Sequence, residues 1–301
     1  MELGISTYTY GWAVEAATTG QLASASVMAM AGASPERPFD ERVLVRRAIS
    51  MGLTLIQVGD NLPLHCFSPE RRGAFKALLR QHHITLEVGA RGLSEEHLQL
   101  YIGICREMGA SVLRFVTDEG DYRPSVDSVI GLIRTHLPLL ERNQVVLAIE
   151  NHDRLKVKEL ARIMDAVDSP FAGVCLDSVN SLGAGEGVEA VVEVLAPYTV
   201  NLHIKDFGIE RLWHRQGFLV EGRIAGEGQL DIPCLVERVR SYHRCKTCVL
   251  EQWVPPESEA ARTLAKEESW AEKGVNYLKK IIYDKNFVGG GRGQDGLQAD
   301  R

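Results

Sequence analysis

Short apolar runs alternate along the chain with longer segments in which apolar residues recur every three or four positions. The short runs, flanked by turn residues, predict eight strands, at 3–8, 54–58, 85–88, 112–116, 145–150, 173–177, 200–204 and 247–251. The longer segments predict helices at 40–51, 69–82, 94–108, 126–142, 156–166, 188–195, 232–243 and 260–282. Strands that alternate with helices in this way indicate βα units and a parallel sheet.

Eight strand-helix pairs match the size of a (β/α)8 TIM barrel, which typically needs about 250 residues. A doubly wound open sheet is the competing α/β fold, and it normally carries a Gly-rich phosphate turn after its first strand. Here the first strand runs into Tyr8-Thr-Tyr-Gly-Trp-Ala instead. We therefore predict a single-domain TIM barrel over residues 1–287.

Two segments depart from the repeat. Residues 11–39 form a long insertion after the first strand, at the end of the barrel where active-site loops lie, and could serve as a lid. Residues 288–301 are rich in glycine and lack apolar periodicity, so we expect a disordered tail.

Composition narrows the class of protein. The 301 residues are 45% hydrophobic and 25% charged, with a net charge of -6, which is typical of a soluble globular protein and gives no basic footprint for nucleic acid. The N-terminus has no signal-peptide pattern and no run is apolar enough to cross a membrane, so we expect a cytoplasmic protein without membrane or nucleic-acid partners. The six scattered cysteines are interpreted as reduced residues, and the Cys245-Lys-Thr-Cys248 spacing as incidental.

Four ionisable residues end or closely follow the last predicted strands, where catalytic groups of TIM barrels lie. They are Glu150, Asp177, His203 and Glu251. Side chains alternate between the two faces of a strand. The residues on the same face as these four are mostly small or polar, and the opposite face carries larger aliphatic residues that suit packing against helices. All four side chains are therefore expected to point into the barrel mouth.

Three carboxylates gathered at one barrel mouth need a compensating charge, because like charges and burial both oppose ionisation. A divalent cation supplies that charge. Three oxygen donors and one imidazole suit Mn²⁺, the ion we favour, or Mg²⁺ or Co²⁺, and Zn²⁺ is compatible. We therefore predict one bound divalent metal ion.

The motifs around these residues resemble those of the xylose isomerase-like TIM barrels, a superfamily that includes sugar phosphate isomerases/epimerases, ketose 3-epimerases, inosose dehydratases and endonuclease IV. The matching motifs are Ala-Ile-Glu150-Asn, Leu-Asp177-Ser, Leu-His203-Ile-Lys-Asp, Gly226-Glu-Gly-Gln-Leu-Asp231 and Leu-Glu251. The resemblance implies that Glu150, Asp177, His203 and Glu251 hold the metal, and that Glu150 and Glu251 also act as an acid/base pair. It further implies a small carbohydrate substrate and a homo-oligomer, a dimer or tetramer.

Further residues near the predicted strand ends are candidates for substrate binding: Asn180, Lys205, Arg223, Glu227, His152 and Arg114. Epimerases of the superfamily usually carry a histidine three residues after the metal aspartate, and here Asn180 takes that position. An amide can hydrogen-bond a hydroxyl group but does not change charge near neutral pH. We therefore expect the substrate or the reaction to differ from a simple epimerisation.

Four functions remain open from the sequence. The first is an isomerase or epimerase of a ketose or sugar acid that works through a metal-stabilised enediolate. The second is a lyase that dehydrates or decarboxylates an oxidised (3-oxo) sugar acid through the same enediolate, which Asn180 favours mildly. An endonuclease IV-like repair enzyme is disfavoured, since the additional histidine ligands and a basic surface are missing. A non-catalytic binding barrel would need neither the metal nor both glutamates.

Overall fold

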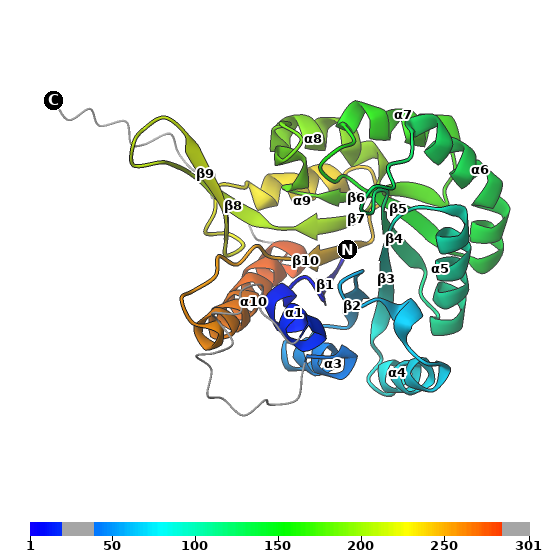
Figure 1. Ribbon diagram of the computed structural model, residues 1–301, viewed down its shortest axis with the longest axis horizontal. Coiled ribbons are helices and arrows are strands. Elements are labelled where there is room, and N and C mark those ends of the chain that lie inside the picture. Colours follow the sequence, from blue (N-terminus) through cyan, green and yellow to red (C-terminus); the bar gives the residue numbers. More distant parts are fainter. Residues whose placement is uncertain (20–38, 285–301) are drawn as a thin grey trace.

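A computed structural model describes residues 1–19 and 39–284 of the chain. Eight parallel strands close into a barrel in the order β1, β10, β7, β6, β5, β4, β3, β2 (Figure 1). These strands are β1 (Glu2–Ser6), β2 (Leu55–Val58), β3 (Thr85–Arg91), β4 (Val112–Val116), β5 (Val146–Glu150), β6 (Ala172–Asp177), β7 (Thr199–Ile204) and β10 (Thr247–Leu250). The predicted TIM barrel is confirmed.

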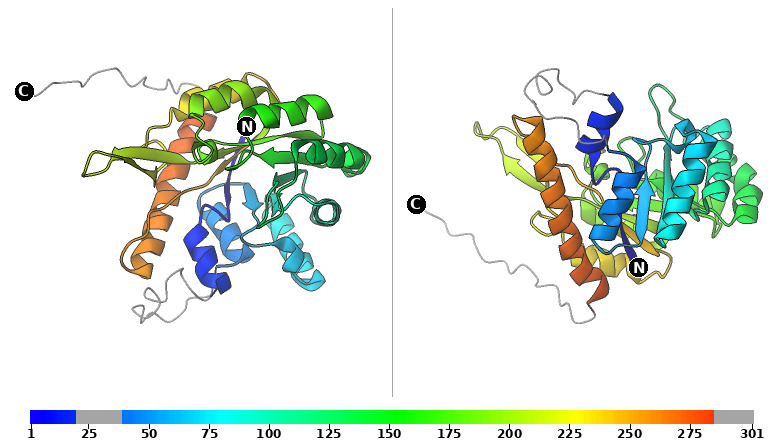
Figure 2. Two further views of the ribbon diagram at one scale, coloured as in Figure 1. Left: turned by 45° about the horizontal axis from the view of Figure 1, so that its top comes forward. Right: turned by 90° about the horizontal axis from the view of Figure 1, so that it is seen from below.

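Helices surround the barrel and cover the outward faces of its strands (Figures 1 and 2). They are α1 (Gly11–Thr19), α3 (Glu41–Ser50), α4 (Pro69–Gln81), α5 (Glu95–Met108), α6 (Val126–Asn143), α7 (Val157–Val167), α8 (Val188–Leu195), α9 (Ile232–Arg240) and α10 (Ala260–Tyr283). The outward-facing aliphatic residues of the strands, such as Leu147, Val174 and Leu202, are fully buried against this ring. Within the described residues, none of these helices combines the length and apolarity that a membrane crossing requires.

Short polar residues start several of the helices. Ser68, Ser94 and Ser125 each accept a backbone N–H from the first turn of α4, α5 and α6. Such N-caps satisfy donors that the helix itself leaves unpaired. At the other end of α5, Gly109 adopts a left-handed conformation with φ of 80°, which glycine tolerates without steric cost. Local sequence therefore fixes where these helices start and stop.

Two regions differ from the predicted repeat. Part of the insertion after β1 is helix α1, whereas residues 20–38, the rest of the predicted lid, lie outside the described residues, as does the predicted tail at 288–301. After β7 the chain forms an antiparallel hairpin of β8 (Asp206–Arg211) and β9 (Phe218–Arg223) instead of a simple loop. The hairpin projects from the barrel (Figure 1).

Candidate functional site

A buried asparagine fixes the ends of β5 and β6 relative to each other. The Asn151 side chain accepts a hydrogen bond from the Asp177 backbone N–H at 2.7 Å and donates to the Asp177 carbonyl at 2.9 Å. It also donates to Ser181 Oγ at 2.9 Å. Asp177 Oδ1 then accepts the backbone N–H groups of Val179 and Asn180. The Asp177 carboxylate is therefore held by backbone donors on one oxygen, and its second oxygen faces the barrel mouth.

A buried carboxylate performs a similar task after β7. Asp206 accepts four backbone N–H groups, from Phe207, Gly226, Gly228 and Leu230, at 2.8–3.1 Å. Gly228 is required here, because a Cβ at this position would lie 2.0 Å from Asp206 Oδ1. The Lys-Asp and Gly-Glu-Gly motifs of the sequence are thus two halves of one hydrogen-bonded unit. This unit fixes the chain next to Lys205.

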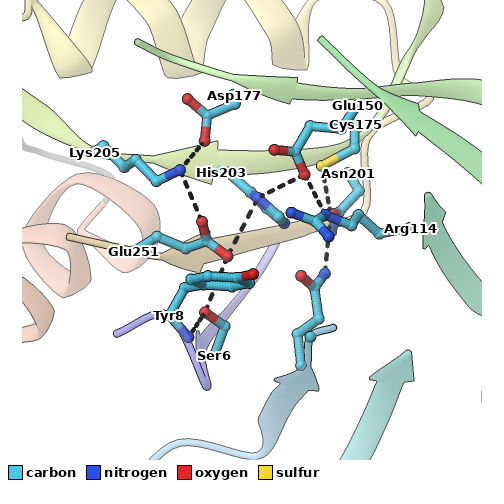
Figure 3. Close-up of polar contacts among 12 residues, drawn as sticks. Ser6, Tyr8, Arg114, Glu150, Cys175, Asp177, Asn201, His203, Lys205 and Glu251 are labelled. Carbon is cyan, nitrogen blue, oxygen red and sulfur yellow. Dashed lines mark hydrogen bonds and ion pairs between the residues drawn. The ribbon is translucent and has the colours of Figure 1, made fainter. Parts of the chain in front are cut away.

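His203 lies at the centre of the site. Its Nδ1 is 3.4 Å from Glu251 Oε1 and 3.7 Å from Glu150 Oε2, so the imidazole lies between the two glutamates (Figure 3). Donor atoms of Asp177, His203 and Glu251 all lie within 4.8 Å of one another. The same holds for Glu150, His203 and Cys175. The four residues predicted as metal ligands therefore converge at the carboxyl ends of β5, β6, β7 and β10.

Both carboxylate oxygens of Glu150 are engaged. Arg114 Nε donates to Oε2, and Asn180 Nδ2 donates to Oε1 at 2.8 Å. Arg114 also pairs with Asp60 through its NH1 group. Burial by itself lowers the pKa of Arg114, but the adjacent Glu150 and Asp60 carboxylates outweigh it and raise that pKa. Arg114 is therefore a permanent buried cation.

Lys205 forms the second buried cation of the site. Its Nζ is 2.7 Å from Asp177 Oδ2 and 3.0 Å from Glu251 Oε2, and 3.4 Å from Asn180 Oδ1. Burial opposes the charge of this ammonium, and the surrounding Asp177 and Glu251 carboxylates more than offset that effect and raise the pKa of Lys205. The Trp253 ring lies 5.7 Å from the same Nζ. The predicted substrate contacts Lys205, Arg114 and Asn180 thus border the cluster directly.

The donor set fits a divalent metal ion. Neither ring nitrogen of His203 has a hydrogen-bond partner among the residues that the structure describes, although the side chain is fully buried. Buried polar atoms without a partner are rare in folded proteins and call for an explanation such as an ion. Oxygen donors together with one imidazole suit Mg²⁺, Mn²⁺ or Zn²⁺. The arrangement is therefore compatible with the predicted ion.

Three of the predicted substrate contacts lie outside the cluster. Arg223 is on β9, where its guanidinium pairs with Glu210 and Glu221 on the hairpin, because the hairpin carries it away from the barrel mouth. Glu227 is exposed in the turn that Asp206 organises. His152 Nε2 lies 3.3 Å from the Arg91 guanidinium, and both residues line a neighbouring cavity of about 360 Å³. The structure places none of the three next to His203.

Sequence reasoning missed two residues that contact the cluster. Ser6, at the end of β1, donates to Glu251 Oε1 at 3.0 Å. Asp60, two residues after β2, joins Arg114 to Arg91, whose Nε lies 3.1 Å from Asp60 Oδ2. Both follow the same strand-end rule that identified the glutamates. Applying this rule to the second strand would have found Asp60, whereas Ser6 lies inside the first strand as predicted, because that prediction extends two residues beyond the end of β1.

A larger cavity of about 680 Å³ opens beside the cluster and is lined by residues of α1, the hairpin and the segment after β10. Tyr8 and Trp253 line it and also approach the two buried cations, since the Tyr8 ring lies 5.7 Å from the Arg114 guanidinium carbon. The Tyr8 and Trp253 rings therefore lie between this cavity and the two buried cations of the cluster.

Comparisons with known proteins agree with this geometry. The model of the family described as "Xylose isomerase-like TIM barrel" matches residues 45–281. The 3-oxo-isoapionate decarboxylase of Pectobacterium atrosepticum is 29% identical over 278 residues, which cover 92% of this chain and 95% of the relative.

Solved structures support the fold. D-psicose 3-epimerase from Clostridium cellulolyticum H10, solved with D-tagatose, aligns with a TM-score of 0.67 at 12% identity, covering 94% of this chain and 99% of that one. The IOLI protein, solved with a zinc atom, aligns with a TM-score of 0.63 at 15% identity, covering 94% of this chain and 100% of that one. At such identities the likeness concerns the fold alone.

Proposed function

Because the chain belongs to the xylose isomerase-like TIM barrel family, we propose that it is a divalent-metal-dependent lyase that decarboxylates a 3-oxo sugar acid. The relative that matches nearly its whole length is named for such a reaction. A lyase is one of the two metal-dependent functions that the sequence leaves open. Two features of the site support this choice.

The charge of the site is the observation that carries the proposal. Four carboxylates and three cationic side chains form one network at the barrel mouth: Asp60, Glu150, Asp177 and Glu251 against Arg91, Arg114 and Lys205. With His203 neutral, this network has one excess negative charge, and a divalent ion changes it to one excess positive charge. A substrate with one carboxylate neutralises the loaded site, whereas a neutral ketose leaves a buried charge uncompensated, which is unfavourable.

The hydrogen bonds that hold the Glu150 carboxylate also favour a lyase. An epimerase needs a free carboxylate on each face of the substrate carbon to remove and return a proton. Here both oxygens of Glu150 already accept hydrogen bonds, from Arg114 and Asn180. A β-keto acid needs no base for its first step, because the bond to the leaving carboxylate supplies the electron pair. A tightly held Glu150 therefore suits decarboxylation better than proton exchange.

The proposed reaction breaks the bond between C2 and the carboxylate carbon. The electron pair of that bond forms the C2–C3 enolate with its charge on the 3-oxo oxygen, CO2 leaves, and a proton then adds to C2. When bound by Asp177, His203, Glu251 and Glu150, the metal would supply Lewis-acid polarisation of the 3-oxo group. Lys205 offsets the charge that develops on oxygen. The proton that adds to C2 comes from solvent, and Glu251, which is held by Ser6 and Lys205, is proposed to orient the water that delivers it.

An isomerase or epimerase of a ketose or sugar acid is the second candidate. Its support is the position of Glu150 and Glu251 on either side of His203 Nδ1, at 3.7 and 3.4 Å. In this reaction both glutamates would have to exchange protons with the substrate.

Incubation with Mn²⁺ in D2O separates the two candidates. The substrate panel contains 3-oxo sugar acids, including 3-oxo-isoapionate, and the ketoses and sugar acids of matching size. Release of CO2 with one deuterium at the former C2 is the expected result. Deuterium in recovered, uncleaved sugar with no CO2 would refute the lyase and favour the epimerase. Lys205→Met should reduce kcat about 100-fold or more, in line with the loss of one oxyanion-stabilising group, with Lys273→Met as an exposed control.

A further inference from the structure

A layer of polar side chains lies inside the barrel, where TIM barrels usually pack branched aliphatic residues. Glu87 of β3 is its centre. Gln57 Nε2 and Asn201 Nδ2 both donate to Glu87 Oε2, at 3.0 and 2.9 Å. Asn201 also donates to Thr247 Oγ1 at 2.8 Å and accepts a hydrogen bond from the Cys175 thiol at 3.1 Å. Residues of five strands are thus joined in one network.

This network lies directly beneath the metal site. Asn201 precedes His203 by two residues on β7, so both side chains face the barrel interior, one layer apart. Cys175 stands in the same relation to Asp177 on β6. Burial raises the pKa of Glu87, and the nearby His203 is among the groups that act against this rise. The carboxyl group of Glu87 and the imidazole therefore belong to neighbouring layers of one interior.

Each of these two side chains has an atom without a partner. Among the residues that the structure describes, Glu87 Oε1 and both ring nitrogens of His203 lack a hydrogen bond, and Glu87 is only 1% exposed. His203 Nδ1 faces Glu150 and Glu251 and is therefore the nitrogen available to the metal. A histidine that ligates a metal through Nδ1 carries its proton on Nε2 and usually donates it to a carboxylate, a carbonyl or a water.

We propose that Glu87 is the positioning residue of the metal site, and that its Oε1 accepts the His203 Nε2–H, directly or through one buried water. The amides of Gln57 and Asn201 occupy Oε2 and so direct Oε1 to this task. A buried water with polar partners on both sides is a common way to satisfy such groups. Glu87 fixes the tautomer and the ring orientation of His203. This inference rests on the metal site of the proposed function but not on the reaction catalysed there.

Glu87→Gln tests the hydrogen bond with almost no change of volume. The glutamine oxygen can still accept from Gln57 and Asn201, so its NH2 group replaces Oε1 and turns a donor toward the His203 Nε2–H. The affinity for Mn²⁺, measured by titration calorimetry on metal-free protein without substrate, should fall about 10- to 100-fold. Glu87→Asp retains an acceptor and should keep the affinity within about threefold if a water adjusts.

Thr199→Val is the matched control. It removes a fully buried hydroxyl from β7, the strand of His203, at nearly constant volume, and that hydroxyl donates to the Leu195 carbonyl, so Mn²⁺ should bind as in the wild type. An unaltered affinity in Glu87→Gln, or an equal loss in Thr199→Val, would overturn the inference. If the wild type bound no divalent ion, the metal site itself would fail, and the inference with it. Thermal unfolding of the metal-free variants shows whether each one folds.

A spectroscopic signature adds a readout that a general loss of stability would not produce. In ¹⁵N-labelled protein loaded with diamagnetic Mg²⁺ or Zn²⁺, a hydrogen-bonded His203 Nε2–H should give an imidazole resonance that is protected from solvent exchange. It should persist in Glu87→Asp and Thr199→Val, and shift or disappear in Glu87→Gln. A resonance unaffected in Glu87→Gln contradicts the proposed contact.

Discussion

Asp206→Asn should destabilise the protein far more than an ordinary change from a carboxylate to an amide. Each oxygen of Asp206 accepts two backbone N–H groups: Oδ1 from Phe207 and Leu230, and Oδ2 from Gly226 and Gly228. An asparagine has one oxygen, so either orientation of its amide leaves two buried donors facing an NH2 group. Hydrogen bonds to a charged group contribute about 1.5–3 kcal/mol each, so the loss should be roughly 3–6 kcal/mol.

Asp231→Asn provides the matched control. Asp231 is an exposed N-cap of α9 that accepts one backbone N–H, from Cys234, at 3.0 Å. Asparagine caps helices about as well as aspartate, so this variant should lose almost no stability. Urea unfolding gives the free energies. Thermal unfolding should show a fall in Tm of roughly 6–24 °C for Asp206→Asn, since about 2–4 °C corresponds to 1 kcal/mol in a domain of this size.

A difference of less than about 1 kcal/mol between the unfolding free energies of Asp206→Asn and Asp231→Asn would contradict this role of Asp206. Such a result would mean that the turn at Gly226 and Gly228 rearranges at little cost and that the four hydrogen bonds do not hold it. It would also remove the explanation for the position of Lys205, which directly precedes Asp206. The measurement uses no substrate, so it is independent of the reaction proposed above.

Three further predictions concern charge. Burial raises the pKa of Glu267 from 4.5 to about 7, so between these two values the native state retains a proton that the unfolded state loses. The free energy of unfolding should therefore fall by up to roughly 3 kcal/mol as pH rises from 4.5 to above 7. Urea unfolding of Glu267→Gln at a series of pH values should not show this fall. Mn²⁺ at 100 times its Kd should stabilise the wild type by about 2.7 kcal/mol, and calorimetry should show most of this gain lost in Asp177→Asn. Arg114→Met should lower the free energy of unfolding by about 3–5 kcal/mol, because Glu150 and Asp60 lose the cation that they share. If Arg114→Lys were as stable as the wild type, a guanidinium that binds both carboxylates would not be needed.

The barrel could be predicted because its strands have one apolar face and because helical segments separate them. The same hydrophobic pattern does not predict the hairpin of β8 and β9. Its residues Ile209, Phe218 and Leu219 are exposed despite their apolar side chains, so hydrophobicity does not report burial there. Helix α1 was missed for a related reason: its sequence, Gly-Trp-Ala-Val-Glu-Ala-Ala-Thr-Thr, offers too little polar contrast to show a helical period. The hydrophobic pattern predicts the structure correctly where the apolar residues are buried and the polar residues are exposed.

The four central residues of the site could be predicted because each one ends or closely follows a strand. The contacts among them could not, since they depend on barrel closure. Ser6 meets Glu251 only because β1 pairs with β10 across most of the chain. Arg223 illustrates the reverse error: it follows the strand that carries His203, but the pairing of β8 with β9 places its guanidinium beside Glu210. The position of a residue at the end of a strand shows at which end of the barrel its side chain lies. The order of the strands in the barrel determines which other side chains it contacts.

Asn180 can now be understood from the partners of its side chain. Its Nδ2 donates to Glu150 at 2.8 Å and its Oδ1 faces Lys205 at 3.4 Å, so one neutral amide contacts both a carboxylate and an ammonium. A histidine at this position could donate to one or accept from the other but would add a group that gains charge near neutral pH. Asn180 therefore bridges a buried carboxylate and a buried ammonium without adding a group that changes charge near neutral pH. This arrangement suits the anionic substrate of the proposed decarboxylation.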